Sequence, residues 1–366
     1  MKLRDLANQL NCTVIGEDEV EITGVAAIET AGPTELTFLA NPKYAAKAKQ
    51  TQAAAILTRQ PMEGISARCV VSQDPYLDFA RALELFYQPP RPSEGIHPTA
   101  VVDETASIGE GAAIAAYCVI GPHVTIGARA VLHPHVVIYE GAKIGDDFLA
   151  HSHSCVREFC QVGNRVILQN GAVVGGDGFG FAKRPDGSHH KIVQSGVTVV
   201  EDDVEIQCLS AIDRATVGET RVRRGAKIDN LVQVGHACEV GEDNIICAQA
   251  GLAGTSRLKK NVLLAGQAGI SGHLTIHENA VVYAQAGVGG DVPAGSLIAG
   301  SPAFDARTWR RAVTAFPQLP EMLRTLRELT KRVEAMEAKR ETHAGSTTEA
   351  DAPQVTGDQQ TDEQKD

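Results

Sequence analysis

The 366-residue sequence is poor in aromatic residues, which make up 4% of the chain and include a single tryptophan. Its core must therefore be built from aliphatic side chains. Acidic residues outnumber basic ones, 45 to 34, and the net charge of −11 argues against binding of nucleic acid. No apolar run reaches the roughly 18 residues that a membrane-spanning helix needs, and the first ten residues lack the apolar centre of a signal peptide. We therefore expect a cytoplasmic protein without a transmembrane segment.

Several sequence motifs of enzymes and metal proteins are also missing. None of the eight cysteines forms a CxxC pair, and in a reducing compartment they are most simply small buried hydrophobic residues. The sequence has no Gly-Lys-Ser/Thr phosphate-binding loop and no serine nucleophile elbow. It therefore predicts neither a P-loop enzyme nor a Ser-His-Asp hydrolase.

The dominant feature of the chain is an apolar residue at every sixth position. The series runs from Ile96 to Val174, is then lost, and resumes from Val222 to Val288. This is the hexapeptide repeat, in which three hexapeptides make a triangular coil of about 18 residues and the sixth-position side chains stack inward. Gly, Asp, Glu or Asn often follows the aliphatic residue, and we expect such residues at the tight corners. The predicted fold is mainly β: a left-handed parallel β-helix of hexapeptide repeats, with an N-terminal α/β domain and a C-terminal helical extension.

Departures from this period divide the chain into four segments. Residues 1–94 predict a small α/β domain, with helices at 3–10 and 75–87 and strands at 53–58 and 67–72. The β-helix is expected over 95–302, with a Gly-rich polar excursion at 175–195. An excursion of this length inside a compact repeat is usually functional, although a tolerated surface insertion remains an alternative.

The end of the chain changes composition twice. Residues 303–341 predict a helical region, because Met322, Leu326, Leu329, Val333 and Met336 follow the 4-3-4-3 spacing of a coiled-coil seam. Residues 303–340 carry nine basic and five acidic side chains, a net charge of +4 that could receive an acidic partner or simply be a solvated face. Residues 342–366 are nearly free of apolar side chains and predict a disordered acidic tail.

Histidines are the main candidates for chemistry, because an aliphatic core leaves only the outer faces and corners of the coils. His236 and His273 are separated by close to two coils, which would place both on one face of the β-helix. Imidazole titrates near neutral pH and is suited to removing a proton from an amine or a hydroxyl. Asp229 and Gln233 lie close to His236 in sequence and could orient its ring. The alternative is that His236 is an ordinary surface histidine.

Metal binding is the main alternative chemical role for the histidines. His133 and His135, and again His151 and His153, are pairs at a spacing of two. Residues 135 and 151 are not one coil apart, and no carboxylate or cysteine completes a set of ligands. The sequence therefore predicts no metal site.

Six motifs in one order resemble a known family. They are LTFLANPKY (36–44), GGDGFGF (175–181), IDRATVGET (212–220), KIDNLVQVGH (227–236), SGH (271–273) and AGSPA (299–303). With a domain before the repeat and a helix after it, the chain over about residues 1–340 resembles the UDP-3-O-acylglucosamine N-acyltransferases of lipid A synthesis.

The resemblance implies a reaction and a set of site residues. The family moves a 3-hydroxyacyl chain from acyl carrier protein to the 2-amino group of a UDP-3-O-acylglucosamine and uses no cofactor. His236 would be the general base, and a backbone N–H near Gly254 would bind the oxyanion. His273 would contact the nucleotide sugar, with Asp229 and Gln233 as further substrate-binding residues.

The resemblance also implies a nucleotide site and an assembly. Phe38, Asn41 and Tyr44 match the family's uracil-binding segment, in which two aromatic rings can sandwich a base and an amide can bond its edge. The family forms homotrimers with active sites between neighbouring β-helices, and the basic C-terminal region would receive the acidic carrier protein.

Two other readings compete with this one. The related O-acyltransferase acting on UDP-N-acetylglucosamine lacks an N-terminal uridine-binding domain, so residues 1–94 argue against it. A non-catalytic β-helical scaffold would explain the repeat but not the grouping of His236, Asp229 and Gln233, nor the Gly-rich excursion.

Overall fold

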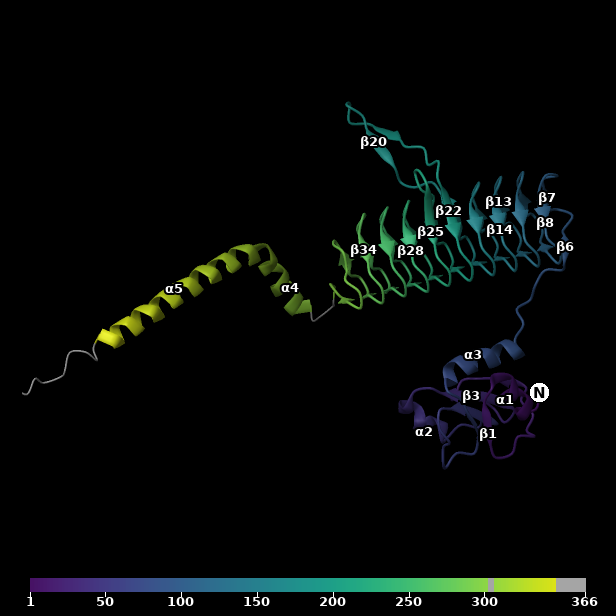
Figure 1. Ribbon diagram of the computed structural model, residues 1–366. Coiled ribbons are helices and arrows are strands. Elements are labelled where there is room, and N and C mark those ends of the chain that lie inside the picture. Colours follow the sequence, from purple (N-terminus) through teal and green to yellow (C-terminus); the bar gives the residue numbers. More distant parts are fainter. Residues whose placement is uncertain (302–305, 347–366) are drawn as a thin grey trace, which may run out of the picture. The chain divides into compact units, whose positions relative to one another are not determined.

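A computed structural model describes residues 1–301 and 306–346 of the chain, which divides into two compact units between Ala172 and Val173. The first unit holds an α/β region and the first coils of a parallel β-solenoid. The second holds further coils, a β-hairpin and the C-terminal helices (Figure 1). The structure confirms the predicted mainly β fold with an α/β region before the repeat and helices after it. No helix among the described residues is long and apolar enough to cross a membrane.

The N-terminal α/β region is built on a five-stranded sheet in the order β1-β5-β4-β3-β2. Only β1 is antiparallel to its neighbour. The elements are α1 (Leu3–Leu10), β1 (Thr13–Ile15), β2 (Gly24–Val25), β3 (Glu35–Leu39), η1 (Pro42–Tyr44), α2 (Ala45–Ala48), β4 (Ala55–Thr58), β5 (Arg68–Val71) and α3 (Pro75–Phe86). The helices predicted at 3–10 and 75–87 and the strands predicted at 53–58 and 67–72 are thus confirmed.

The spacing of the apolar residues explains how this region packs. In α1, Leu3, Leu6 and Leu10 recur on one helical face and are all buried in the core beside the sheet. Helix α3 begins where the Asp74 side chain accepts hydrogen bonds from the backbone N–H groups of residues 76 and 77, both at 3.2 Å. This N-cap satisfies two of the free donors at the start of the helix.

In the first unit, two-residue strands form three parallel sets of neighbours, and each strand pairs with its counterpart in the adjacent coil. One set is β7 (Val101–Val102), β10 (Val119–Ile120), β13 (Val137–Ile138) and β16 (Cys155–Val156). The next is β8 (Ser107–Ile108), β11 (Thr125–Ile126), β14 (Lys143–Ile144) and β17 (Gln161–Val162). The third is β6 (Gly95–Ile96), β9 (Ala113–Ile114), β12 (Val131–Leu132), β15 (Leu149–Ala150) and β18 (Ile167–Leu168).

The second unit repeats the same three parallel sets. One set, which carries the site described below, is β19 (Val173–Gly176), β24 (Ala211–Asp213), β27 (Gln233–Val234), β30 (Gly251–Leu252), β33 (Gly269–Ile270) and β36 (Gly287–Val288). The next is β22 (Val197–Val200), β25 (Glu219–Val222), β28 (Glu239–Val240), β31 (Arg257–Leu258) and β34 (Thr275–Ile276). The third is β23 (Glu205–Ile206), β26 (Lys227–Ile228), β29 (Ile245–Ile246), β32 (Leu263–Leu264), β35 (Val281–Val282) and β37 (Leu297–Ile298).

Two insertions explain why the six-residue series breaks after Val174. Val174 pairs with Ile212 and Ile212 pairs with Val234, so each of these two coils is longer than the uninterrupted coil of about 18 residues. The first insertion is the Gly-rich excursion, which contains the antiparallel hairpin β20 (Phe181–Lys183) and β21 (His189–Lys191). The second is a short insertion between β24 and β25. The inward core is unbroken, since Ile206 and Ile212 are fully buried.

Most corners of the coils hold the small or polar residues that were predicted, but a few hold a large apolar or aromatic residue. A positive φ recurs three positions after the inward aliphatic residue, and its occupants include Tyr117, Phe159 and Leu231. A left-handed conformation costs a non-glycine residue about 1–2 kcal/mol. The cost is offset because many of these residues donate their N–H to the coil before, as Phe159 does to Glu140 O at 3.0 Å.

The C-terminal region is helical, as predicted. It contains α4 (Ala306–Ala315), η2 (Phe316–Gln318) and α5 (Leu319–Ser346). The seam residues of α5 are all exposed, from 47% at Leu329 to 64% at Met336. Helix α5 continues past the expected boundary at 341, because no glycine or proline interrupts it before Gly345. Residues 347–366 lie outside the described residues, so disorder of the tail stays a prediction.

The stacked core makes a prediction about stability. Replacing the fully buried Ile138 by alanine should cost about 2–5 kcal/mol, because the flanking coils can close the cavity only partly. A thermal melt should show a clearly lowered transition for Ile138→Ala. The matched control is Val119→Ala, whose side chain is 41% exposed. An equal effect of the two substitutions would contradict an inward aliphatic core.

Candidate functional site

His236 lies at the corner that follows β27, two residues beyond the inward-facing Val234. Its side chain is half-buried. The backbone there is fixed on both sides, because Thr255 N donates to His236 O at 2.8 Å and Ala237 N donates to the Thr220 hydroxyl at 2.8 Å. The imidazole therefore projects from a rigid corner rather than from a free loop.

Gly254 is the residue against which the imidazole packs. The pairing of β27 with β30 places it one coil beyond His236. A Cβ added to Gly254 would lie 2.5 Å from Nε2 of His236, so the ring fits only because position 254 has no side chain. The Gly254 N–H has no hydrogen-bond partner among the described residues. A basic nitrogen and an unpaired backbone donor are thus brought together, as base and oxyanion stabiliser are in acyl transfer.

The Gly-rich excursion reaches the same histidine. A Cβ on Gly178 would meet the Cβ of His236 at 2.6 Å and the Arg214 carbonyl oxygen at 3.2 Å. The predicted site residues did not include Gly178. The length of the excursion and its closely spaced glycines indicated that this segment is functional, but they did not indicate which of its residues contacts His236.

His273 follows β33 and lies one coil beyond Gly254. Its N–H donates to Gly254 O at 3.3 Å, and its side chain is exposed. Backbone hydrogen bonds thus connect the corners of His236, Gly254 and His273 in order. The prediction that both histidines lie on one face of the solenoid is confirmed by this register.

A carboxyl group that the sequence did not single out lies one coil before His236. Asp213 ends β24, and burial raises its pKa to about 6. A hydrogen bond with the Gln233 side chain partly opposes this rise, whereas the charge of Asp177 adds to it. The residues IDR at 212–214 were recognised only as part of a motif, because a lone aspartate in a strand carries no signal of its own.

Asp229 is not brought to His236 within the chain. It follows β26, in a different set of strands, and its carboxylate accepts hydrogen bonds from Asn230 N at 2.7 Å and Ala248 N at 2.9 Å. It lines a separate cavity of about 260 Å³ together with residues such as Lys227 and Cys247. The expectation that Asp229 orients the imidazole is therefore wrong for a single chain, because sequence neighbours separated by a corner face different sides.

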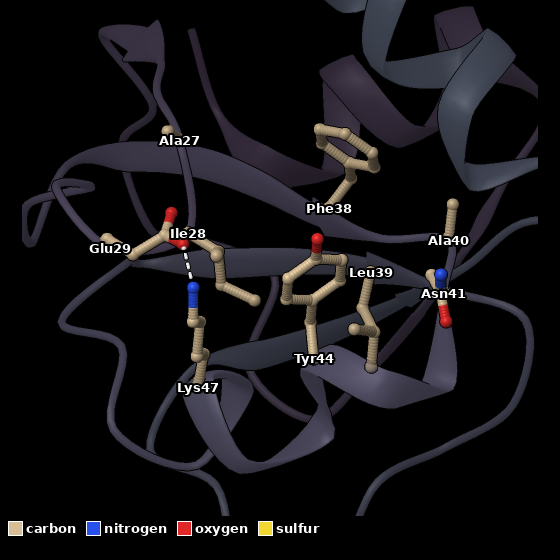
Figure 2. Close-up of a pocket in the computed structure, with 9 residues that line it drawn as sticks. All are labelled: Ala27, Ile28, Glu29, Phe38, Leu39, Ala40, Asn41, Tyr44 and Lys47. Carbon is tan, nitrogen blue, oxygen red and sulfur yellow. Dashed lines mark hydrogen bonds and ion pairs between the residues drawn. The ribbon is translucent and has the colours of Figure 1, made fainter. Parts of the chain in front are cut away.

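Phe38, Asn41 and Tyr44 line one cavity of the first unit, about 320 Å³ in volume (Figure 2). Phe38 projects from β3 and packs against Phe79 of α3, with ring centroids 4.4 Å apart. Tyr44 is 47% exposed. The lining also includes Lys47, whose ammonium lies 5.0 Å from the centre of the Tyr44 ring and forms an ion pair of 2.6 Å with Glu29. The predicted aromatic residues thus line one pocket.

Asn41 has a structural role as well. Its Oδ1 accepts a hydrogen bond from Lys43 N at 3.0 Å and so caps η1, the helical turn that carries Tyr44. No interaction of its Nδ2 with another described residue is seen, so this group can donate into the cavity.

The paired histidines stack in two rows, in which successive rings are one coil apart. The rings of His133 and His151 are 4.8 Å apart and inclined by 6°, and those of His135 and His153 are 5.0 Å apart. Burial lowers the pKa of His133, and the nearby His151 lowers it further. Within the described residues no three His, Cys, Asp or Glu side chains converge as metal ligands.

Comparison with protein families identifies the class of the chain. The model of UDP-3-O-(3-hydroxymyristoyl) glucosamine N-acyltransferase matches residues 19–85, and the bacterial transferase hexapeptide model matches residues 105–140. In fold, the chain is similar to the Arabidopsis UDP-N-acetylglucosamine acyltransferase, with a TM-score of 0.52 at 24% identity over 60% of this chain and 77% of that one. These matches define a hexapeptide-repeat acyltransferase.

Curated relatives identify the family within this class. UDP-3-O-acylglucosamine N-acyltransferase 1 of Koribacter versatilis is 50% identical over 90% of this chain and 98% of its own. The corresponding enzyme 2 of Gloeobacter violaceus is 44% identical over 96% and 95%. The enzyme of Anaeromyxobacter dehalogenans is 40% identical over 92% and 97%. The chain belongs to the UDP-3-O-acylglucosamine N-acyltransferase family.

The contact between Gly254 and His236 predicts the effect of one methyl group. Gly254→Ala should displace the imidazole and reduce acyltransferase activity by at least about tenfold, since small misplacements of catalytic groups are costly. Steady-state kinetics and a melting curve would measure activity and folding. The matched control, Gly251→Ala in the same coil, adds a methyl group that meets no atom within 4 Å. Equal activity of the two variants would contradict the packing argument.

The raised pKa of Asp213 predicts a pH-dependent stability. In the folded protein the Asp213 carboxyl keeps its proton up to about pH 6, whereas in the unfolded chain it loses its proton near pH 4. The contribution of this group to the free energy of unfolding is therefore complete below about pH 4 and is lost as the pH rises through 6. Asp213→Asn should therefore gain melting temperature relative to wild type between pH 4 and pH 7.

A second aspartate provides the control of opposite sign. Hydrogen bonds from Ser188 lower the pKa of Asp186, so Asp186→Asn should lose relative stability as the pH rises from the acid range. The effect should be small, because the group is exposed. A difference for Asp213→Asn that does not change with pH would contradict the assigned burial.

Proposed function

We propose that the protein transfers a 3-hydroxyacyl chain from acyl carrier protein to the 2-amino group of UDP-3-O-(3-hydroxyacyl)glucosamine, a step of lipid A synthesis, in the cytoplasm and without a cofactor. Family membership supports the acceptor and the bond formed. The observation that carries the mechanism is the contact between the His236 imidazole and Gly254, whose N–H has no partner among the described residues.

In the proposed reaction His236 is the general base. Its imidazole removes a proton from the amine as the nitrogen attacks the thioester carbonyl carbon. The carbonyl oxygen becomes an oxyanion, which the Gly254 N–H stabilises by a hydrogen bond. Collapse of the tetrahedral intermediate forms the amide and expels the thiolate of the carrier, and the protonated imidazole returns its proton to that sulfur. Burial raises the pKa of the neighbouring Cys238 thiol to about 11, which disfavours a cysteine nucleophile at this corner.

The uridine of the acceptor fits the cavity of Phe38 and Tyr44. Both rings can contact the faces of a pyrimidine, and the Asn41 amide can donate to a carbonyl on its edge. Asn41 accepts from Lys43 through Oδ1, which orients Nδ2 as the donor. His273, exposed one coil beyond Gly254, is the proposed contact to the nucleotide sugar.

The remaining predicted residues have different proposed roles. Gln233 holds Asp213 and so shapes the surface beneath His236. Asp229 belongs to another set of strands, and in a trimer with sites between chains it would serve the site of a neighbouring copy. The proposed segments are the uridine-binding domain at 1–94, the catalytic β-helix at 95–302, the helical region at 303–341 and the tail beyond it.

The carrier protein is proposed to bind near the C-terminal helices. Arg324, Arg327 and Lys331 lie on α5 with Leu323 around a cavity of about 370 Å³. Exposed cations of this kind speed the encounter with an acidic partner, an effect that salt screens.

The direct test is acyl transfer with purified protein, 3-hydroxyacyl carrier protein and UDP-3-O-(3-hydroxyacyl)glucosamine. Wild type should be active, and His236→Ala should lose at least about 10²-fold in kcat because proton removal then falls to water. The matched control, His277→Ala, removes another histidine of the second unit and should stay near wild type.

Two results would refute parts of the proposal. Full activity of His236→Ala would exclude it as the base. A folded wild type that uses UDP-N-acetylglucosamine instead of the amino sugar would be an O-acyltransferase.

A further inference from the structure

One ion pair lies in the wall of the cavity that forms the proposed uridine site. Among the nine described residues that line this cavity, Lys47 carries the one positive charge and Glu29 the one negative charge. The other lining residues are neutral and mostly apolar, such as Ile28 and Leu39. Charges interact more strongly beside apolar surface than in open water. The pair therefore marks the part of the cavity that can recognise an ionic group.

The ammonium of Lys47 has two neighbours in this wall. Its Nζ lies 2.6 Å from Glu29 Oε1 and 5.0 Å from the centre of the Tyr44 ring. The hydrogen bond to Glu29 raises the pKa of Lys47, so the lysine stays charged. Both side chains of the ion pair are 49% exposed, and exposed ion pairs contribute little to stability. The carboxylate can therefore be replaced by another anion at small cost.

The remaining contacts of the cavity direct a bound nucleotide toward this pair. Figure 2 shows the Asn41 side chain on one side of the Tyr44 ring and the pair of Lys47 and Glu29 on the other. In the proposed function the Asn41 amide donates to a carbonyl of the base. O4 of uracil can accept that bond and lies across the ring from N1, the atom that carries the ribose. A uracil bound in this way sends its ribose and phosphates toward Lys47.

We propose that Lys47 binds the diphosphate of the nucleotide sugar, and that Glu29 pairs with this lysine only while the cavity is empty. The inference rests on the proposed function and adds two residues to the predicted uridine-binding segment. When the nucleotide binds, phosphate oxygens replace the Glu29 carboxylate as acceptors of the Lys47 hydrogen bond. A diphosphate carries more negative charge than one carboxylate, and its hydrogen bonds with an ammonium are charge-assisted. The pair thus selects a nucleoside diphosphate over the bare nucleoside.

The experiment measures the dissociation constants of uridine and UDP by calorimetry on the full-length chain. Lys47→Met removes the charge and keeps an apolar side chain of similar length, Lys47→Arg keeps the charge, and Glu29→Gln removes the carboxylate. The matched control is Lys49→Met, which removes the same charge from an exposed lysine outside the nine lining residues. A melting curve of each variant checks its folding.

The expected effects depend on the phosphates. Lys47→Met should raise the Kd of UDP about three- to tenfold and leave the Kd of uridine unchanged. Lys47→Arg and Lys49→Met should bind both ligands as wild type does. Glu29→Gln should bind UDP about two- to fivefold more tightly, because no carboxylate then competes for Lys47. Added salt should reduce the preference of wild type for UDP over uridine.

Acyl transfer gives a second measurement of the same contact. Lys47→Met should raise the KM for UDP-3-O-acylglucosamine by about the factor found for UDP and leave kcat unchanged, because the lysine lies in the uridine site and not beside His236. A fall in kcat with unchanged KM would overturn the proposal.

Three binding results would also contradict it, and they can be told apart. Equal losses of uridine and UDP affinity in Lys47→Met would show that the lysine only supports the Tyr44 ring. Weaker UDP binding by Glu29→Gln would show that Glu29 itself contacts the nucleotide, which would overturn the exchange. Equal binding of uridine and UDP by wild type would refute the diphosphate contact alone, whereas a wild type that binds neither would refute the proposed uridine site.

Discussion

The backbone hydrogen bonds between residues one coil apart are the interaction on which the rest of the structure depends. Most solenoid strands have only two residues, too few to be stable without neighbours. Each strand gains its stability by pairing with the strand of the adjacent coil, as Val234 pairs with Leu252 and Leu252 with Ile270. This fixed offset stacks the aliphatic residues inward. The same offset arranges the corner residues His236, Gly254 and Gly272 in one column along the outside.

A column of corners has a geometric consequence for function. Residues in successive coils lie close together, and the ring of His236 packs over position 254 because that position has no side chain. Insertions can enter only where they leave the pairing intact on both sides. The excursion follows β19 and the short insertion follows β24. Both strands belong to the same set as β27, the strand that precedes His236. The Gly178 contact shows that the start of the excursion packs against this column.

The sequence predicted the coils because their period is strict, and it predicted the shared face of His236 and His273 because coil length sets their register. It failed where contacts depend on which corner a residue follows. Asp229 is close to His236 in sequence but belongs to another set of strands, whereas Asp213 is much farther along the chain and lies one coil below it. The side-chain contact of Gln194 with Gly178 joins residues whose spacing follows no repeat, so no period could reveal it. The predicted small or polar residues occupy most corners, and the few exceptions arise because hydrogen bonds to the preceding coil allow Tyr, Phe or Leu to take a left-handed conformation.

Helix α5 can serve two proposed partners at once, because its apolar and basic residues occupy different positions. Met322, Leu326 and Leu329 follow a seam that suits the same helix in another copy of the chain. Arg324, Arg327 and Lys331 are offset from that seam by one or two residues, so on a helix they point to other sides. Burial of the seam in a trimer would therefore leave the cations exposed to an acidic carrier protein. Assembly and donor binding would then be linked, because a trimer would bring together the basic faces of three α5 helices.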